Sequence, residues 1–180
     1  DQLSQIAPTF LTDFEDDWAQ SLRTVGELTA KEDEAEDLID GLEEEIVQTR
    51  ESLDYDSEDT VVIVRLYGGM ENMWLVGDET YKFLFDSEEG IGLNTPDNYS
   101  AEGDQISLEA LIDMNPDYVI AVEEDKDAYD TWVNRLEESD GWQTTNAAQN
   151  DEIHYVNSLS FGPLEIQHTL NHMKEIFEEK

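Results

Sequence analysis

The sequence predicts an α/β fold: a Rossmann-like lobe with a small, mostly parallel sheet flanked by helices, preceded by one long helix. Three short apolar runs, at 60–67, 117–122 and 152–158, alternate with segments whose apolar residues have helical spacing. The first run is largely β-branched and too apolar for a half-exposed strand, which is typical of a central parallel strand. We therefore expect parallel strands joined by right-handed crossovers.

The long helix is predicted over 30–54. Its apolar residues form one narrow stripe and the rest are mostly charged, a pattern that favours a helix bridging two bodies. Such a helix would extend roughly 35 Å. The chain thus divides into an entry segment with a first helix at 1–29, the long helix at 30–54 and an α/β lobe at 55–180. The stripe consists of Ala35, Leu38, Ile39, Leu42, Ile46 and Leu53.

Helix caps and helix breakers define the remaining helices. Ser107 can cap a helix over 108–114, and Pro163 suits the first turn of a final helix that ends near Phe177. A helix is also expected over 80–89, with Gly90 as its C-cap. The first helix has one apolar face, which consists of Phe14, Trp18, Leu22 and Val25.

Acidic residues dominate the charge of the chain, with 46 Asp and Glu against 9 Lys and Arg and a net charge of -37. They are spread along the whole chain, which favours a solvated surface adapted to high salt, and so a halophile-like source, over an acidic interaction arm. In molar salt the Debye length falls to about 3 Å, so self-repulsion is screened. Nucleic acid is excluded as a partner because phosphate contacts need basic residues. The chain has no Cys, and no apolar run reaches the ~18 residues of a membrane span.

The carboxyl ends of the predicted strands form the expected ligand edge, since ligands of such sheets bind beyond these ends. The ends fall at 65–67, 123–125 and 158–161. Arg65 ends an otherwise apolar strand, and its forked guanidinium suits carboxylate or hydroxamate oxygens. A salt bridge to one of the many acids is the alternative.

Three aromatic residues follow strand ends and suit the walls of a site for a flat, apolar ligand. They are Tyr67, Trp74 and Phe161, and ordinary core packing is the alternative for each. Met70 and Met73 lie near Trp74 and are expected to fill apolar space rather than to contact a ligand.

Four segments carry motifs of a known family. SLEALIDMNPDYVIAV at 107–122 is similar to the family pattern S-x-E-x-L-x-x-x-x-P-D-x-I/V-x-V. Residues 3–10 resemble the exit from an N-terminal lobe, and 18–46 resemble a W-x-x-x-L-x-x-L-G helix with the rigid interlobe helix after it. Residues 146–177 resemble the A-V-K-N-G-R-V-Y-x-V segment and the last helix. The family is that of ABC-importer substrate-binding proteins for iron-siderophores and vitamin B12. The resemblance implies a C-terminal lobe with its interlobe helix, and an N-terminal lobe with a lipid anchor that this chain lacks.

The resemblance further implies an extracytoplasmic protein that captures a ferric siderophore and delivers it to an ABC permease. The protein would need no cofactor, because the siderophore fills the coordination shell of the iron. An Arg at the place of Arg65 favours a hydroxamate ligand, with haem and cobalamin as alternatives in the same family. The G-x-E motif at 77–79 puts Glu79, or Asp78 as its alternate, where family members dock onto permease arginines. An acid that is favoured by a helix dipole is the simpler explanation of this motif.

The sequence predicts neither an enzyme nor a metal site. His168 and His172 have a zinc-compatible i, i+4 spacing, but no HExxH glutamate and no Cys accompany them, so an exposed pair is expected. A metallohydrolase built on this pair is the weakest alternative, and His154 is expected to be structural. No phosphate-binding loop or nucleophile elbow is present. The other alternative is a stand-alone acidic scaffold that docks partners on the helix at 30–53.

Overall fold

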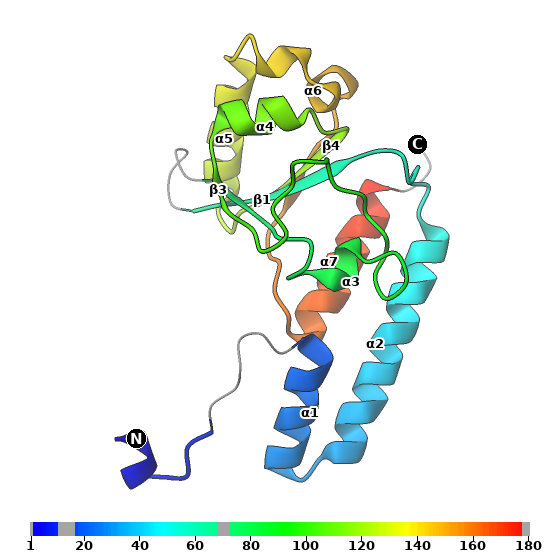
Figure 1. The fold of residues 1–180 in the computed structure, drawn as a ribbon, viewed down its shortest axis with the longest axis vertical. Coiled ribbons are helices and arrows are strands. Elements are labelled where there is room, and N and C mark those ends of the chain that lie inside the picture. Colours follow the sequence, from blue (N-terminus) through cyan, green and yellow to red (C-terminus); the bar gives the residue numbers. More distant parts are fainter. Residues whose placement is uncertain (1, 11–16, 68–72, 178–180) are drawn as a thin grey trace.

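The computed structural model describes residues 2–10, 17–67 and 73–177, and the middle layer of its α/β part is a five-stranded sheet (Figure 1). The strand order is β3-β2-β1-β4-β5, in which β1, β4 and β5 are parallel. Strand β2 is antiparallel to β1, and β3 is antiparallel to β2. The predicted small, mostly parallel sheet is therefore confirmed, with a short antiparallel edge added. The strands are β1 (Val61–Leu66), β2 (Met73–Leu75), β3 (Gln105–Ile106), β4 (Tyr118–Val122) and β5 (Ile153–Val156).

Helices cover both faces of the sheet. The side chains of α2, α3 and α7 pack on one face, and those of α4, α5 and α6 pack on the other. Figure 1 shows the two sets on opposite sides of β1 and β4. The helices are α1 (Trp18–Thr29), α2 (Glu32–Ser52), α3 (Lys82–Phe85), α4 (Leu108–Met114), α5 (Lys126–Glu137), α6 (Asn146–Asn150) and α7 (Pro163–Ile176), with 3-10 turns η1 (Leu3–Gln5) and η2 (Trp142–Thr144).

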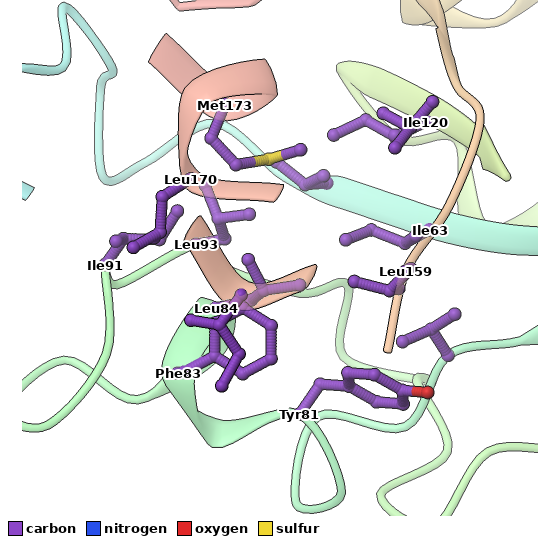
Figure 2. Packing of buried hydrophobic residues seen from close by; sticks show 14 of the residues in the cluster. Ile63, Tyr81, Phe83, Leu84, Ile91, Leu93, Ile120, Leu159, Leu170 and Met173 are labelled. Carbon is purple, nitrogen blue, oxygen red and sulfur yellow. The ribbon is translucent and has the colours of Figure 1, made fainter. Parts of the chain in front are cut away.

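Strand β1 is apolar on both faces because it contributes to two cores. Val61 and Ile63 belong to the cluster under α2 and α7, whereas Val62 and Val64 belong to the cluster under α4 and α5. This division follows from the alternation of side chains along a strand. Figure 2 shows Ile63 facing Met173 and Leu159 within the first cluster. Each fully buried aliphatic side chain contributes about 1.5–3 kcal/mol, so these residues stabilise the central strand from both sides.

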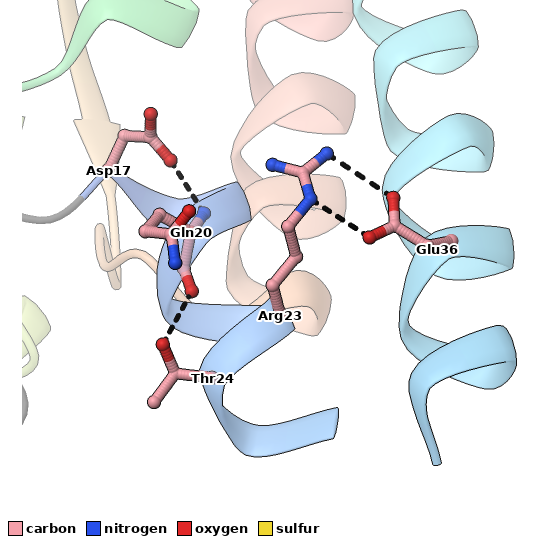
Figure 3. A network of polar contacts seen from close by, with 5 residues as sticks. All are labelled: Asp17, Gln20, Arg23, Thr24 and Glu36. Carbon is pink, nitrogen blue, oxygen red and sulfur yellow. Dashed lines mark hydrogen bonds and ion pairs between the residues drawn. The ribbon is translucent and has the colours of Figure 1, made fainter. Parts of the chain in front are cut away.

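Helices α1 and α2 form an antiparallel hairpin that extends beyond the sheet (Figure 1). Asp17 caps α1 by accepting the N–H of Gln20 at 2.7 Å, and Arg23 holds both carboxylate oxygens of Glu36 on α2 at 2.9 and 3.3 Å (Figure 3). Gly26 permits the close crossing, because a Cβ there would lie 2.7 Å from the Cβ of Ala35. The motif glycine thus has a packing role.

The predicted apolar stripes are only partly buried. Most of the stripe on α2 faces the core, but Leu38 is 52% exposed, and Val25 on α1 is 49% exposed. No described residue covers these outward positions of the hairpin, so part of each apolar stripe is exposed. Phe14, which was expected on the same face as Val25, lies outside the described residues.

Helix α3 ends earlier than expected, at Phe85 rather than Glu89. The carboxylate of Asp86 accepts the N–H groups of Glu88 and Glu89 at 2.7 and 2.8 Å, and these bonds lower the pKa of Asp86. A short Asp side chain that binds nearby backbone in this way competes with helix continuation. Gly90 does not cap this helix; it packs so close to α3 that a Cβ there would lie 2.1 Å from the carbonyl oxygen of Lys82.

The segment 107–122, which carries the family motif, has a structural role at the amino ends of the strands. Ser107 caps α4 by accepting the N–H of Ala110 at 3.3 Å. Asp117 accepts the N–H and the hydroxyl of Thr60 at 2.8 and 2.9 Å, and the side-chain amide of Asn146 at 2.8 Å. Burial raises the pKa of Asp117, but these hydrogen bonds outweigh burial and lower it. The motif therefore aligns the starts of β1 and β4.

Candidate ligand-binding edge

Arg65 lies at the carboxyl end of β1, on the face of the sheet that α7 covers. Its Nη2 donates hydrogen bonds to the Tyr81 hydroxyl at 2.7 Å and to the carbonyl oxygen of Leu159. The guanidinium thus joins β1 to the segment before α3 and to the segment between β5 and α7. These bonds use only Nη2, and no described residue accepts a hydrogen bond from Nη1 or Nε. A salt bridge was the alternative expectation for Arg65, but Arg65 forms no ion pair with a described carboxylate.

Tyr81 is the residue of this edge that the sequence did not indicate. Its ring stacks on Phe161 with centroids 4.3 Å apart and an interplanar angle of 23°. Its N–H donates to the carbonyl oxygen of Gly77 at 3.1 Å, which closes a turn before α3. Figure 2 shows Tyr81 at the edge of the apolar cluster, on the side away from Met173. The sequence did not indicate that Tyr81 contacts Arg65 and Phe161, because Tyr81 lies in a segment that was expected to be wholly helical.

Trp74 and Tyr67 are the exposed aromatic residues of the edge. Trp74 stands directly opposite Arg65 in the antiparallel register of β1 and β2, so the two side chains share one face. Trp74 is 43% exposed and Tyr67 is 59% exposed. Phe161 is half-buried against the core through Tyr81. The structure therefore brings Arg65, Trp74 and Phe161 to one edge. Met73 is buried in β2, as a filler residue should be, and Met70 lies outside the described residues.

A second cation, Lys126, follows the carboxyl end of β4. Its Nζ forms an ion pair with Asp130 and lies 4.3 Å from the centroid of the Tyr129 ring and 5.1 Å from that of Tyr155. Burial raises the pKa of Tyr129 to about 12, with smaller contributions from nearby carboxylates. The charge of Lys126 is thus already balanced within the described part of the chain, whereas that of Arg65 is not.

The turn at 77–79 carries two acidic residues that differ in their exposure to solvent. Glu79 is exposed on a backbone whose N–H donates to the carbonyl oxygen of Ala101 at 3.0 Å. Gly77 lets this turn approach the same segment, because a Cβ there would lie 2.4 Å from that oxygen. Asp78 is half-buried: its Oδ2 accepts the hydroxyl of Thr95 at 3.3 Å, and its Oδ1 is buried without a described donor. Of the two predicted docking residues, Glu79 is the one available at the surface.

The three histidines fall into two sites. His154 on β5 lies 2.8 Å from the Glu152 carboxylate and stacks near Tyr118, a structural setting. His168 and His172 lie side by side on α7, with ring centroids 4.4 Å apart. Within the described residues, no three His, Cys, Asp or Glu side chains gather as metal ligands.

Comparisons with known proteins identify the class to which this chain belongs. The profile of the periplasmic binding protein family matches residues 1–158. The iron-uptake system-binding protein of Bacillus subtilis (strain 168) is 26% identical over 148 residues, which are 79% of this chain and 45% of that protein. The chain therefore belongs to the periplasmic binding protein family, and it spans less than half the length of this relative.

Solved structures show the same fold at low identity. The triscatecholate siderophore binding protein FeuA from Bacillus subtilis, complexed with Ferri-Bacillibactin, has a TM-score of 0.74 at 19% identity, over 98% of this chain and 65% of FeuA. A FhuD-fold periplasmic binding protein component of a Fep/Fec-like ferrichrome ABC transporter from Bacillus subtilis has a TM-score of 0.73 at 19% identity, over 99% of this chain and 70% of that one. None of the helices that the structure describes combines the length and apolar character needed to cross a membrane.

Proposed function

We propose that this chain is the C-terminal lobe, with the interlobe helix α2, of an extracytoplasmic solute-binding protein that captures a ferric siderophore for an ABC permease. Family membership and the names of similar proteins support the iron-siderophore cargo. The observation that carries the proposal is Arg65, a cation at the ligand edge that is held in place yet has no carboxylate partner among the described residues.

Arg65 would bind the chelate oxygens of the ligand. Tyr81 and Leu159 hold Nη2, so the guanidinium is oriented before ligand arrives, and no described residue accepts from its other nitrogens. Donors that are already oriented lose less conformational freedom on binding. Trp74 and Phe161 would pack against the apolar flanks of the ligand. A forked cation suits the paired oxygens of a hydroxamate, which is why we propose this siderophore type.

The net charge of -37 opposes an anionic chelate at long range. In molar salt this field decays within about 3 Å, so the local charge of Arg65 decides binding. Glu79 would then dock the loaded protein onto cationic residues of the permease, since it is exposed on a turn that backbone contacts hold. A preceding N-terminal lobe, carrying a lipid anchor, would supply the other half of the ligand site and of the docking surface.

The test is a tryptophan fluorescence titration of the full-length gene product in about 1 M NaCl, where charge repulsion is screened. Ferrioxamine, a ferric catecholate, haem and cobalamin are titrated separately. We expect saturable quenching by ferrioxamine, weakened roughly tenfold or more by Arg65→Ala, since a charged hydrogen bond is worth about 1.5–3 kcal/mol. Arg135→Ala, at an exposed position on α5, is the matched control.

Each ligand gives a distinct answer. Binding of the catecholate alone would overturn the hydroxamate assignment and keep the iron-siderophore cargo. Binding of haem or cobalamin alone would change the cargo as well. If a folded protein binds none of the four, or if Arg65→Ala and Arg135→Ala bind ferrioxamine equally, the role proposed for Arg65 is wrong.

A further inference from the structure

His168 and His172 belong to a cluster of side chains whose nitrogen and oxygen atoms could bind a metal ion. This cluster is separate from the residues that Arg65 contacts. The Nε2 atoms of the two rings are 3.1 Å apart, and the planes of the rings are inclined by 77°. The side-chain oxygen of Asn157, the residue that follows β5, lies 2.8 Å from Nε2 of His168. Nε2 of His168 therefore contacts both of the other atoms beside α7, and each of the three can offer a lone pair.

A fourth residue decides which nitrogen of His172 carries hydrogen. The Glu175 carboxylate lies 3.3 Å from Nδ1 of His172, so Nδ1 donates and Nε2 presents its lone pair to His168. The Asn157 oxygen is also an acceptor. A single hydrogen, on Nε2 of His168, therefore serves two acceptors. A metal ion in place of that hydrogen would satisfy all three atoms at once.

The separation of the two nitrogens fits such an ion, whereas the Asn157 oxygen, 2.8 Å from Nε2 of His168, would have to move outward by roughly 0.5 Å to join the shell. Nitrogen ligands lie about 2.0–2.1 Å from zinc, so two of them in a tetrahedral shell are roughly 3.3 Å apart. The observed separation of the Nε2 atoms is 3.1 Å. Metal-bound histidines commonly donate their second N–H to a carboxylate, as His172 does to Glu175. His172 is also partly shielded, with 24% of its side chain exposed.

We propose that Asn157, His168 and His172 form a site for a divalent transition-metal ion of the class that imidazole prefers, such as Zn²⁺, with Glu175 in the outer shell. The ion would tie the segment after β5 to α7. That segment leads to Leu159, whose carbonyl oxygen accepts from Arg65. The third ligand is an amide oxygen eleven residues before His168, which is why histidine spacing alone did not predict the site. This inference does not depend on the proposed cargo.

The test measures Zn²⁺ binding to the full chain by isothermal titration calorimetry in about 1 M NaCl with excess Mg²⁺, which occupies non-specific carboxylates. We expect one Zn²⁺ per chain. His168→Gln and His172→Gln should each weaken binding at least about tenfold, and Glu175→Gln should weaken it roughly 10-fold, the lower end of outer-shell effects. His154→Gln, which alters the histidine of the other site, is the matched control and should bind as the unmodified chain does.

Two results would overturn the proposal. One is equal Zn²⁺ affinity in His168→Gln, His172→Gln and His154→Gln, which would assign binding to the acidic surface. The other concerns the unmodified chain and so does not depend on how the variants fold. In its NMR spectrum, Zn²⁺ must shift the imidazole nitrogen signals of two histidines and leave the third unchanged; unshifted signals would exclude an imidazole site.

Discussion

Among the described residues, the Tyr81 hydroxyl is one of two acceptors for Arg65 at the candidate ligand edge, and it accepts from this charged donor at 2.7 Å. Tyr81→Phe removes that acceptor while it keeps the ring that stacks on Phe161. We expect the free energy of unfolding to fall by about 1.5–3 kcal/mol, the range for a hydrogen bond to a charged group. Urea denaturation at neutral pH measures this change.

Tyr155→Phe is the control for Tyr81→Phe. Tyr155 is half-buried on β5, and its hydroxyl makes no hydrogen bond to a described residue. Its loss should change the free energy of unfolding by less than about 0.5 kcal/mol. Equal destabilisation by both substitutions would mean that the Tyr81 hydroxyl contributes no specific bond to Arg65.

Asp117 predicts a pH dependence of stability at the amino ends of β1 and β4. Its folded-state pKa is lowered by the donors on Thr60 and Asn146, so its contribution is present above the ordinary Asp pKa of about 3.9 and is lost as pH falls below it. In Asp117→Asn an amide NH2 replaces one carboxylate oxygen and cannot accept from Thr60 or Asn146. The substitution should lower the free energy of unfolding by about 1–3 kcal/mol at pH 7. The difference from the unmodified chain should shrink between about pH 4 and pH 2.

Thermal unfolding of both proteins across this pH range measures that difference. Asp113→Asn, at an exposed position on α4, controls for the general effect of removing one acid. A stability gap between Asp117→Asn and the unmodified chain that stays constant down to pH 2 would show that the carboxylate charge of Asp117 contributes nothing.

At the scale of elements, Arg50 links the C-terminal end of α2 to the turn after α3 by hydrogen bonds. Its Nη1 donates to the carbonyl oxygens of Ser87, Glu88 and Gly90 at 3.2, 2.8 and 2.8 Å. Arg50→Ala leaves these carbonyls without their cation and should lower the free energy of unfolding by about 1.5–3 kcal/mol. The measurement is a urea melt in which Arg135→Ala, on the exposed face of α5, serves as control. Similar midpoints for the two variants would contradict the prediction.

The elements that the sequence predicted well are those with strong local signals. Strand β1 has a β-branched run, α4 has the Ser107 cap, and α7 has Pro163 in its first turn; all three lie where they were expected. Strands β2 and β3 have three and two residues, too few for periodicity to show; β2 pairs with the edge of β1, and β3 pairs with β2. Helix α3 was overestimated because Asp86 captures backbone donors that helix spacing alone does not reveal.

The candidate site was predictable only where one residue contrasts with its neighbours. Arg65 stands out as a charge in an apolar strand, and the strand order places Trp74 opposite it. Tyr81 has no such contrast, since its partners are 16 and 80 positions away and meet it only in the folded chain. Asn157 was missed for the same reason, because its contact with His168 depends on how α7 turns back along β5.

At the scale of the whole molecule, the acid surface sets the response to salt. Asp37, Asp40 and Glu44 are exposed on α2 at spacings of three and four residues, where like charges repel. Each such pair destabilises a helix by about 0.2–0.5 kcal/mol at low ionic strength. Screening with a Debye length of about 3 Å in 1 M salt removes this cost.

Neutralising these three acids together should therefore stabilise the protein at low salt and have no effect at high salt. We expect Asp37→Asn/Asp40→Asn/Glu44→Gln to raise the free energy of unfolding by about 0.5–1 kcal/mol in dilute buffer and by nothing measurable in about 1 M NaCl. Urea is the denaturant, because guanidinium is itself a salt. The charge-preserving variant Asp37→Glu/Asp40→Glu/Glu44→Asp should respond to salt as the unmodified chain does. A gain that persists undiminished in 1 M NaCl would show that helix propensity, rather than charge repulsion, separates the variants, and would remove the basis for reading the acid surface as an adaptation to salt.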